Sequence, residues 1–504
     1  MRVTVRPRDS KSAANDADAM PLPREDTTPP VTNTNLVMPE WTSRVQGGGN
    51  ANYKGLVHCY LEKSKFVTQL LVLRINMTEL AGELQGKHIV LGLSGGIAAY
   101  KAAELCRAMV KEGASVQVVM TEAAEQFMTK VTMQALSDRQ VFGSQWDDTP
   151  VSVSGEGIAN NMPHINLTRG ADAIVIAPCS ADFMAKLLHG RADDLLSLMC
   201  LARPIAEVPL ILAPAMNREM WANPATQRNV VQLKQDGITV LEVGEGDQAC
   251  GEVGNGRMLE ADEILADLVS FFTPKSLIGQ KVLITAGPTY EAIDPVRGIT
   301  NLSSGKMGFA IARAAYEAGA EVTLIAGPVS LPTPRGVKRV DVKSAQNMLL
   351  AGVKYADYAT IFIASAAVAD WRPANPADQK LKKDGTDGRG GGVPQLSFVE
   401  NPDILATIAQ SERGKKGLSG MPDGLFCVGF AAESQDLLTN AQAKRIRKGV
   451  PLLVGNIGPA TFGRDDNALL LVDAKTTKEI PKSSKRHLAQ QLISEIANRI
   501  GHSA

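Results

Sequence analysis

The chain has 504 residues, which is more than one hydrophobic core usually accommodates, so about two to four domains are expected. Hydrophobic residues make up 44% of the chain and charged residues 21%, as in soluble globular proteins, and the formal net charge is +0. This balance gives no reason to expect a nucleic-acid or an acidic-membrane partner, and no apolar run is long enough to span a bilayer.

The first 76 residues differ in composition from the rest of the chain, because they are rich in Pro, Asn, Asp, Thr and Gly. Such a segment buries too little apolar surface to offset the entropy that is lost on ordering. We predict that 1–76 is a disordered N-terminal extension that the folded domains do not need.

The six cysteines are scattered, and no two of them form a CxxC pair that would indicate a zinc site. The N-terminus also lacks the order of basic, apolar and small residues that is typical of a signal peptide. The sequence therefore predicts a protein of the reducing cytoplasm, without a disulfide framework. The cysteines are Cys59, Cys106, Cys179, Cys200, Cys250 and Cys427.

From about residue 86 onward, short apolar segments alternate with segments of helical periodicity. A helix is expected over 97–112, with Gly113 as its stop signal. Alternation of this kind predicts a parallel, doubly wound sheet. The strands are expected at 87–93, 115–120, 173–178, 209–214 and 239–243.

The same pattern restarts after Thr273 and Pro274, which predicts a second three-layer α/β domain over about 279–504. A helix is expected over 305–319, and the Gly-rich stretch 384–394 is expected to be a loop. The strands are expected at 281–286, 321–326, 338–342, 360–365, 425–430, 452–456 and 468–472.

Ligands in open α/β sheets bind beyond the carboxyl ends of the strands, so the loops at these ends are the candidate sites. In the first domain, the segment 94–101 (SGGIAAYK) follows the first strand directly. Its glycines allow the backbone to approach a phosphate, and a helix N-terminus attracts negative charge. The glycines do not have the GxGxxG spacing, so a tight strand–helix turn without a ligand is also compatible with this segment.

Three further elements of the first domain carry polar side chains. His164 stands alone, and a lone histidine is more often structural than catalytic. Cys250 lies in the Gly-rich, flexible stretch 248–258, where it is either an incidental thiol or an acid–base group on a loop that closes over a site. The strand expected at 209–214 leads into 214–221 (PAMNREMW).

In the second domain, the turn 303–306 (SSGK) is expected to open the helix 305–319. It is not a P-loop, because GxxxxGK[ST] would require a glycine at Thr300 and a Ser or Thr at Met307. An anion cradle and a helix cap formed by a serine are both compatible with this turn. Basic residues are usually solvated, but several of them near the strand ends, with an acidic residue, suit a Mg-bound triphosphate.

Five separated motifs in the first domain occur in the order that is found in a known family. These are SGGIAAYK, the His164 segment, APCSADFMAK, PxMNxxMW and ACGxxGxGRM. Over about 79–272 they resemble the phosphopantothenoylcysteine decarboxylase half of the bifunctional Dfp (CoaBC) flavoproteins. The segment 147–161 departs from the family as a longer loop. The resemblance implies a flavodoxin-like domain, over about 77–272, that uses FMN.

The resemblance also implies roles for single residues of this domain. His164 would be the active-site base, Asn217 would bind the amide and carboxylate of the substrate, and Cys250 would donate a proton. The FMN contacts would be Ser94, Gly95, Gly96, Ile97, Ser180 and Met216.

The second domain resembles the phosphopantothenate–cysteine ligase half of the same family, which uses CTP. The resemblance implies a Rossmann-like domain in which Asn301 handles an acyl-cytidylate, Lys380 stabilises charge during transfer, and Asp370 binds Mg²⁺. The implied CTP contacts are Ala364, Ser365, Ala366, Asp370, Lys380, Asn401, Pro402, Asp403, Ile404, Phe430, Lys444 and Lys448.

The substrates implied by the resemblance are 4'-phosphopantothenate, L-cysteine and CTP, and the product of ligation is the substrate of decarboxylation. The family also implies a homo-oligomer in which decarboxylase trimers are linked by ligase dimers, for example as a dodecamer. Two alternatives remain at this point: a flavin-dependent decarboxylase of peptidyl cysteines, and a catalytically silent flavoprotein that acts as a regulatory subunit.

Overall fold

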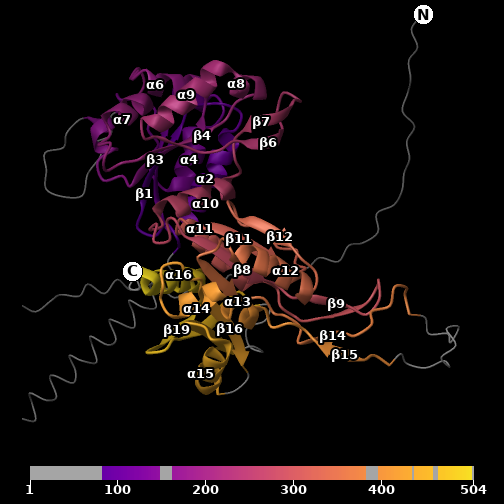
Figure 1. Cartoon of the computed structure of the whole chain (residues 1–504). Helices are drawn as coiled ribbons and strands as arrows, with labels where there is room; N and C mark the ends of the chain where they lie inside the picture. The colour runs from indigo at the N-terminus through magenta and orange to yellow at the C-terminus, as the bar shows by residue number, and fades with distance from the viewer. Residues whose placement is uncertain (1–81, 148–161, 382–394, 434–435, 458–463, 502–504) are drawn as a thin grey trace, which may run out of the picture. The chain divides into compact units, whose positions relative to one another are not determined.

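The structure is a computed structural model that describes residues 82–147, 162–381, 395–433, 436–457 and 464–501. It confirms the expected α/β class, because the described residues form two large, mainly parallel sheets flanked by helices (Figure 1). The predictions made for 1–76, for the insert 384–394 and for the loop that departs from the family lie outside the described residues, apart from Asp147. No described helix has the length and apolar character needed to cross a membrane.

The sheet of the first domain has five parallel strands in the order β2-β1-β3-β4-β5. This is the flavodoxin-like order, and its switch point lies between β1 and β3. The strands are β1 (His88–Leu93), β2 (Ser115–Met120), β3 (Ala173–Cys179), β4 (Leu210–Pro214) and β5 (Thr239–Val240).

Helices cover both faces of this sheet because consecutive residues of its strands are apolar and point alternately to the two faces. In β1, Ile89, Leu91 and Leu93 belong to one buried cluster and Val90 belongs to the other. The first cluster is completed by α2 (Ala99–Lys111), α4 (Lys130–Ser137) and α10 (Ala261–Phe272). The second is completed by α6 (Ala181–Leu188), α7 (Leu195–Ala202) and α9 (Pro224–Gln235). The short helices α3 (Glu122–Glu125), α5 (Pro163–Asn166) and α8 (Arg218–Ala222) lie in the connections.

The sheet of the second domain has eight strands in the order β12-β11-β8-β13-β16-β17-β18-β19. Its first six strands are parallel and have the Rossmann order, with the switch point between β8 and β13, whereas β18 and β19 are antiparallel. The strands are β8 (Lys281–Ala286), β11 (Glu321–Ala326), β12 (Lys338–Asp341), β13 (Ile361–Ala364), β16 (Phe426–Glu433), β17 (Leu452–Ile457), β18 (Asp466–Val472) and β19 (Thr477–Ser484).

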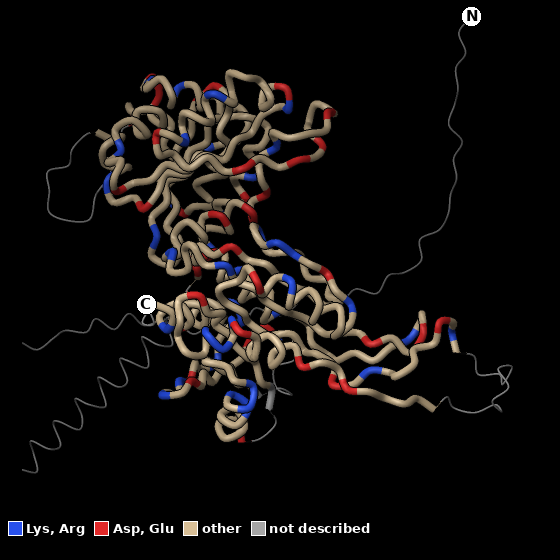
Figure 2. The backbone as a smooth tube through the Cα atoms, in the orientation of Figure 1, with Lys and Arg blue, Asp and Glu red and all other residues tan. Residues whose placement is uncertain are grey.

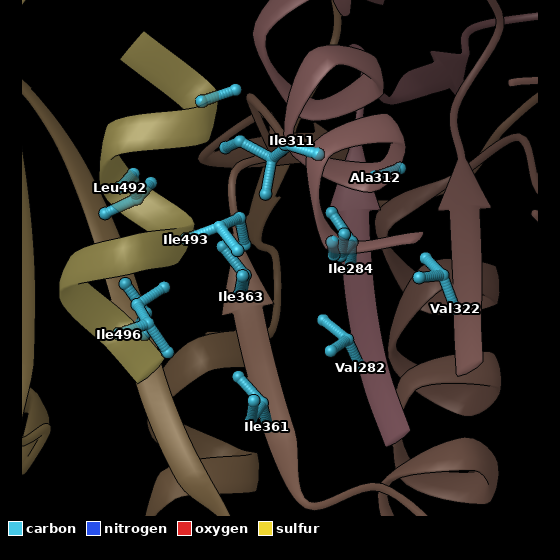
Figure 3. Close-up of a cluster of buried hydrophobic side chains, with 14 of the residues drawn as sticks. Val282, Ile284, Ile311, Ala312, Val322, Ile361, Ile363, Leu492, Ile493 and Ile496 are labelled. Carbon is cyan, nitrogen blue, oxygen red and sulfur yellow. The ribbon is translucent and has the colours of Figure 1, made fainter. Parts of the chain in front are cut away.

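Two helices, α11 (Lys306–Glu317) and α16 (Lys485–Gly501), cover one face of the second sheet. Figure 3 shows Ile311 of α11 and Ile493 of α16 directed at the strands that carry Ile284 and Ile363. The opposite face packs against α12 (Ala345–Ala356), α13 (Ile404–Ala409) and α15 (Leu437–Lys448), while α14 (Glu412–Leu418) contacts β16. Three two-stranded ladders complete the structure: β6–β7 (Gly244–Asp247, Val253–Arg257), β9–β10 (Tyr290–Ala292, Gly298–Thr300) and β14–β15 (Trp371–Pro373, Phe398–Glu400).

The element boundaries differ from the sequence predictions at a few places. The helix expected over 97–112 begins at Ala99, with Ala98 as its N-cap. Gly95 and Gly96, which precede it, have φ angles of 97° and 121° that no helix adopts. The strand expected at 239–243 is only two residues long. Strand β19 was not predicted, since Ile480 is the only residue of this edge strand with a buried side chain and its apolar periodicity is therefore weak.

Candidate functional sites

A cavity of about 600 Å³ lies at the carboxyl ends of the strands of the first sheet. Pockets for cofactors and small ligands in proteins are typically about 300–1,000 Å³ in volume. The loops that follow β1, β3 and β4 all contribute to its wall, as expected for a switch-point site. Of the predicted residues, Gly95, Gly96, Ile97, Ser180, Met216, Asn217 and Cys250 line it.

The glycine loop forms one wall of this cavity. Gly95 has a φ of 97°, which other residues rarely adopt, and a Cβ atom there would lie 3.0 Å from the Ala123 backbone. The loop leads into the N-terminus of α2, which has no side-chain capping hydrogen bond. The N–H groups of Ala99 and Lys101 donate to the carbonyl oxygens of Gly96 and Ala98, and the N-terminus of this 13-residue helix is suited to attract an anion.

Ser94 does not line the cavity, although it was predicted as an FMN contact. Its hydroxyl donates to the carbonyl oxygen of Pro178 (2.8 Å) and accepts from the Ser180 N–H (2.9 Å). Ser94 is buried, so this pair of bonds fixes the loop after β1 to the loop after β3. Ser94 therefore stabilises the wall of the cavity through these two loops and does not contribute its own surface to it.

The Gly-rich stretch 248–258 forms the turn and the second strand of the hairpin β6–β7, and Cys250 lies in the turn. Cys250 is exposed, and its Sγ lies 3.4 Å from Nδ2 of Asn217, so the structure brings these two predicted residues together. The hairpin docks through the Met216 N–H, which donates to the carbonyl oxygen of Gly256 (2.9 Å). Gly256 has a φ of 123°, and a Cβ atom there would lie 2.7 Å from the Met216 oxygen.

We therefore expect Gly256→Ala to displace the hairpin from the cavity and to lower the activity of this site at least about tenfold. The control is Gly237→Ala, because Gly237 has a φ of 81° but open space around its Cβ position. The control shares the backbone strain and lacks the clash. Equal loss of activity in both variants would contradict the docking argument. The measurement is CO₂ release at saturating substrate, the reaction that the sequence resemblance implies for this domain.

Lys101 is a site residue that the sequence reasoning missed, although the residue ends the motif SGGIAAYK. Its side chain is only 2% exposed, and Nζ donates to the Met258 carbonyl oxygen and to Glu260 Oε1, both at 2.8 Å. The hydrogen bond from Lys101 is the largest cause of a lowered pKa of the Glu260 carboxyl, to which Arg257 also contributes. Lys101 thus fastens the chain after β7 to helix α2. In the sequence, a lysine among the alanines at the start of this helix was the signal that could have indicated a buried lysine.

His164 is not among the residues that line this cavity. It lies half-buried in the short helix α5, and its carbonyl oxygen accepts from the hydroxyl of Thr168 (3.1 Å). The lining of the cavity in one chain therefore contains Asn217 and Cys250 but not His164.

A second cavity, of about 640 Å³, lies at the switch point between β8 and β13. Thr285 near the end of β8, Ala364 at the end of β13 and the N-terminus of α11 contribute to its wall. The predicted CTP contacts other than Lys380 all line it: Ala364, Ser365, Ala366, Asp370, Asn401, Pro402, Asp403, Ile404, Phe430, Lys444 and Lys448.

The N-terminus of α11 opens into this second cavity. Its N-cap is Gly305, with a φ of 74° and no side-chain capping bond. Ser303 does not cap the helix. Its hydroxyl accepts a hydrogen bond from the Gly305 N–H (3.4 Å). A Cβ atom on Gly308 would lie 2.4 Å from that of Ala286, so only glycine allows the helix this close to the strand ends. The arrangement suits an anion held by backbone N–H groups.

Asn301 lies beside the cavity but does not line it. Its Nδ2 donates to the Ala367 carbonyl oxygen, and its Oδ1 accepts from the Ser303 N–H (3.0 Å). Asn301 therefore joins the loop before α11 to the loop after β13, and both of these loops form the wall.

Five basic side chains line the second cavity, of which the sequence prediction had included only two as CTP contacts. They come from α15, where Figure 2 shows Lys and Arg gathered, and from the first residues of α11 and α16. Burial lowers the pKa of Lys448, although nearby Asp370 opposes this, and Lys448 Nζ bonds to Asp403 Oδ2. The pKa of Lys485 is also lowered, by burial and by the charge of Lys306. The five are Lys306, Lys444, Arg447, Lys448 and Lys485.

Lys380 is exposed and does not line the cavity. Its neighbour Leu381 is held by Asp294, whose carboxylate accepts from the Leu381 N–H (3.2 Å) and from Arg297 Nε (3.0 Å). Burial alone would raise the pKa of Asp294, but the hydrogen bonds from Val296, Arg297 and Leu381 lower it to about 2. Asp294 thus fixes the backbone at Leu381, next to Lys380.

Comparison with known proteins supplies a family for both halves of the chain. Residues 77–273 match the family model described as Flavoprotein, and 277–500 match the model described as DNA/pantothenate metabolism flavoprotein C-terminal domain. A bifunctional coenzyme A biosynthesis protein, CoaBC, of Vibrio cholerae serotype O1 is 46% identical over 413 residues, which is 81% of this chain and 98% of that protein.

Two solved structures each resemble one half of the chain. The C-terminal domain of a CoaBC protein is 32% identical and covers 45% of this chain and 99% of its own, with a TM-score of 0.37. A PPC decarboxylase mutant complexed with pantothenoylaminoethenethiol is 32% identical and covers 37% of this chain and 98% of its own, with a TM-score of 0.33. From the matches over most of its length, we conclude that the chain belongs to the CoaBC family of bifunctional coenzyme A biosynthesis proteins.

Proposed function

We propose that this chain catalyses two consecutive reactions of coenzyme A biosynthesis in two separate cavities. Residues 279–504 would use CTP to ligate cysteine to 4'-phosphopantothenate, and 77–272 would decarboxylate phosphopantothenoylcysteine to 4'-phosphopantetheine with FMN. The observation that carries the proposal is the pair of switch-point cavities. One contains the amide of Asn217 beside the thiol of Cys250, and the other is lined by five basic side chains.

The first cavity has the parts that FMN requires. The positive-φ glycines and the uncapped N-terminus of α2 would hold the phosphate, while Ile97, Ser180 and Met216 would contact the rest of the cofactor. Bound FMN supplies the oxidation and reduction that let a cysteine carboxylate leave, because the amidated amino acid has no electron sink of its own.

The chain's own residues would position the substrate and move its protons. The Asn217 amide would donate to the carboxylate of phosphopantothenoylcysteine, and His164 would act as base. The thiol of Cys250, held at the Asn217 amide, would give a proton to the enethiol carbon after CO₂ has left.

The second cavity suits the activation of a carboxylate by CTP. A carboxylate is a poor acyl donor until one of its oxygens becomes a good leaving group. The phosphopantothenate carboxylate would attack the α-phosphate of CTP, release pyrophosphate and form an acyl-cytidylate, from which the cysteine amine displaces CMP. The α11 N-terminus and the lining lysines would hold the triphosphate. Asn301 and Lys380, which do not line the cavity of the free chain, would act on the acyl-cytidylate.

Magnesium fits this cavity only as a partner of the triphosphate. The described residues contain no group of three or more His, Cys, Asp or Glu side chains that could hold a metal ion. Mg²⁺ in nucleotide sites is usually bound through one or two carboxylates together with phosphate oxygens. Asp370, which lines the cavity, is the residue that we propose for this role.

We further propose that the protein acts in the cytoplasm as a homo-oligomer of decarboxylase trimers and ligase dimers. His164 does not line the cavity of its own chain, and in such an oligomer a neighbouring copy would bring a His164 to it. At the cavity, Ile97 and Tyr100 are 65% and 52% exposed, and a second copy would cover these apolar side chains.

The test incubates the protein with 4'-phosphopantothenate, cysteine, CTP and Mg²⁺ and follows CMP and CO₂ together. His164→Asn is expected to stop CO₂ release and to leave CMP formation unchanged. Lys380→Gln is expected to slow CMP formation and to leave decarboxylation of supplied phosphopantothenoylcysteine unchanged. If either substitution abolished both reactions in a folded protein, the proposed division of labour would be wrong. Activity on peptidyl cysteines alone would support the alternative decarboxylase instead.

A further inference from the structure

The amide of Asn217 is oriented by the helix that this residue caps. Its Oδ1 accepts hydrogen bonds from the N–H groups of Glu219 (2.8 Å) and Met220 (3.4 Å) at the start of α8. With its oxygen engaged in this way, an asparagine side chain has only its N–H₂ donors to offer to a ligand. Asn217 therefore presents a donor to the cavity that it lines, a polarity that suits an anionic ligand group.

This donor is engaged by a carboxylate of the same chain. Asn217 Nδ2 donates to Oε2 of Glu252, a residue in the turn between β6 and β7. The Cys250 thiol lies 3.7 Å from the same oxygen. Amide, thiol and carboxylate thus form one cluster, although Glu252 itself is not among the residues that line the cavity.

The hairpin holds the carboxylate at this place. The Gln248 N–H donates to the Glu252 carbonyl oxygen (2.8 Å), which closes the turn. Arg218 donates from its backbone N–H to Gln248 Oε1 (3.0 Å) and from Nη1 to the Val253 carbonyl oxygen (3.2 Å). Its Nε lies 3.9 Å from Glu252 Oε2. Arg218 of helix α8 therefore binds the hairpin before and after Glu252, at Gln248 and at Val253.

We propose that Glu252 is a specificity residue of the decarboxylase cavity, whose carboxylate competes with that of the substrate for the Asn217 amide. The proposal rests on the proposed function, in which Asn217 binds the carboxylate of phosphopantothenoylcysteine. Binding of substrate then exchanges one carboxylate for another at the same donor. The product has lost its carboxylate and cannot hold the donor, so Glu252 returns to Asn217 and the product is bound less tightly than the substrate.

The size of this competition follows from the exposure of Glu252. Its side chain is 39% exposed, so solvent screens its charge and the effect on substrate affinity is that of a surface ion pair. We expect a factor of about two to five. The effect is selective, because only a ligand that carries a carboxylate is affected.

The experiment compares Glu252→Gln and Glu252→Ala with the wild-type chain. Both variants remove the charge, and the alanine variant also excludes a new bond from a glutamine to Asn217. We expect KM for phosphopantothenoylcysteine to fall by about two- to fivefold in both variants. The inhibition constant of 4'-phosphopantetheine, measured as a competitive inhibitor, is expected to stay unchanged. FMN content, read from visible absorbance, is expected to match the wild type.

The matched control is Glu245→Gln, on the same hairpin. Glu245 is an exposed carboxylate of β6 that lies opposite Asn255 in the ladder. It carries the same charge without contact to Asn217, so neither constant is expected to change. A fall in KM for this variant would mean that the general charge of the hairpin, and not Glu252, sets the affinity, and the proposal would be overturned.

A rise in KM in the Glu252 variants would also overturn the proposal, as would equal changes of KM and of the inhibition constant, which indicate a structural role. These results differ from a failure of the proposed function. A wild-type chain that releases no CO₂ from phosphopantothenoylcysteine contradicts the function itself. A Glu252→Gln protein that decarboxylates with unaltered KM contradicts only the inference.

Discussion

Asn217→Asp is expected to lower kcat/KM for decarboxylation about 100-fold while the ligase activity stays unchanged. An aspartate keeps the oxygen that caps α8 but replaces the N–H₂ donor by a second oxygen. That oxygen would face the Glu252 carboxylate and the carboxylate of the substrate, so one charged hydrogen bond is exchanged for repulsion. The measurement is CO₂ release from supplied phosphopantothenoylcysteine, with CMP formation followed in parallel.

The control for this prediction is Asn223→Asp. Asn223 caps the next helix, α9, in the same way, because its side chain accepts from the Ala225 N–H (2.9 Å). It does not line the cavity, so the same chemical change is expected to leave decarboxylation intact. Full activity of Asn217→Asp would show that the amide donor takes no part in binding the substrate.

Lys448→Met is expected to raise KM for CTP about tenfold or more and to leave decarboxylation unchanged. The side chain lines the second cavity and is bonded to Asp403, and methionine retains much of its length without the charge. Burial lowers the pKa of Lys448, although the charge of Asp370 opposes this shift, so removal from water is the main influence on the ammonium group. A triphosphate would supply negative charge to stabilise this group.

The prediction for Lys448 has two comparison variants. Lys448→Arg keeps the charge and is expected to retain most of the affinity for CTP. Lys416→Met removes an exposed lysine of α14 that does not line the cavity, and KM for CTP is expected to stay at the wild-type value. An unchanged KM for CTP in Lys448→Met would place the triphosphate elsewhere.

The strand and helix order of both domains could be predicted because it depends on local patterns. Runs such as 281–286 and 321–326 are mostly apolar, which is typical of a strand covered on both faces, and helical periodicity ending at Gly319 separates the two runs. Strand β19 escaped this reasoning because its charged, edge-strand sequence buries little. The hairpin β6–β7 escaped it because its glycines also fit an irregular loop.

The candidate sites were predictable to the extent that they follow strand ends. The loops at 95–97 and 364–366 lie in the walls of the two cavities because parallel strands end at the same edge of a sheet. Lys101, Glu252, Arg447 and Lys485 were missed, since each reaches its site from a helix or hairpin whose place is set by packing. His164 and Lys380 belong to the expected motifs, yet neither lines a cavity.

The sequence by itself determined the class of the fold, the two halves of the chain and the loops that carry ligand chemistry, because apolar periodicity and strand ends are encoded over a few neighbouring residues. Only the tertiary structure decided which side chains meet. The contacts of Lys101 with Glu260 and of Asn217 with Glu252 join residues that are 159 and 35 positions apart. Their distances depend on how whole helices and hairpins pack, which no local pattern specifies.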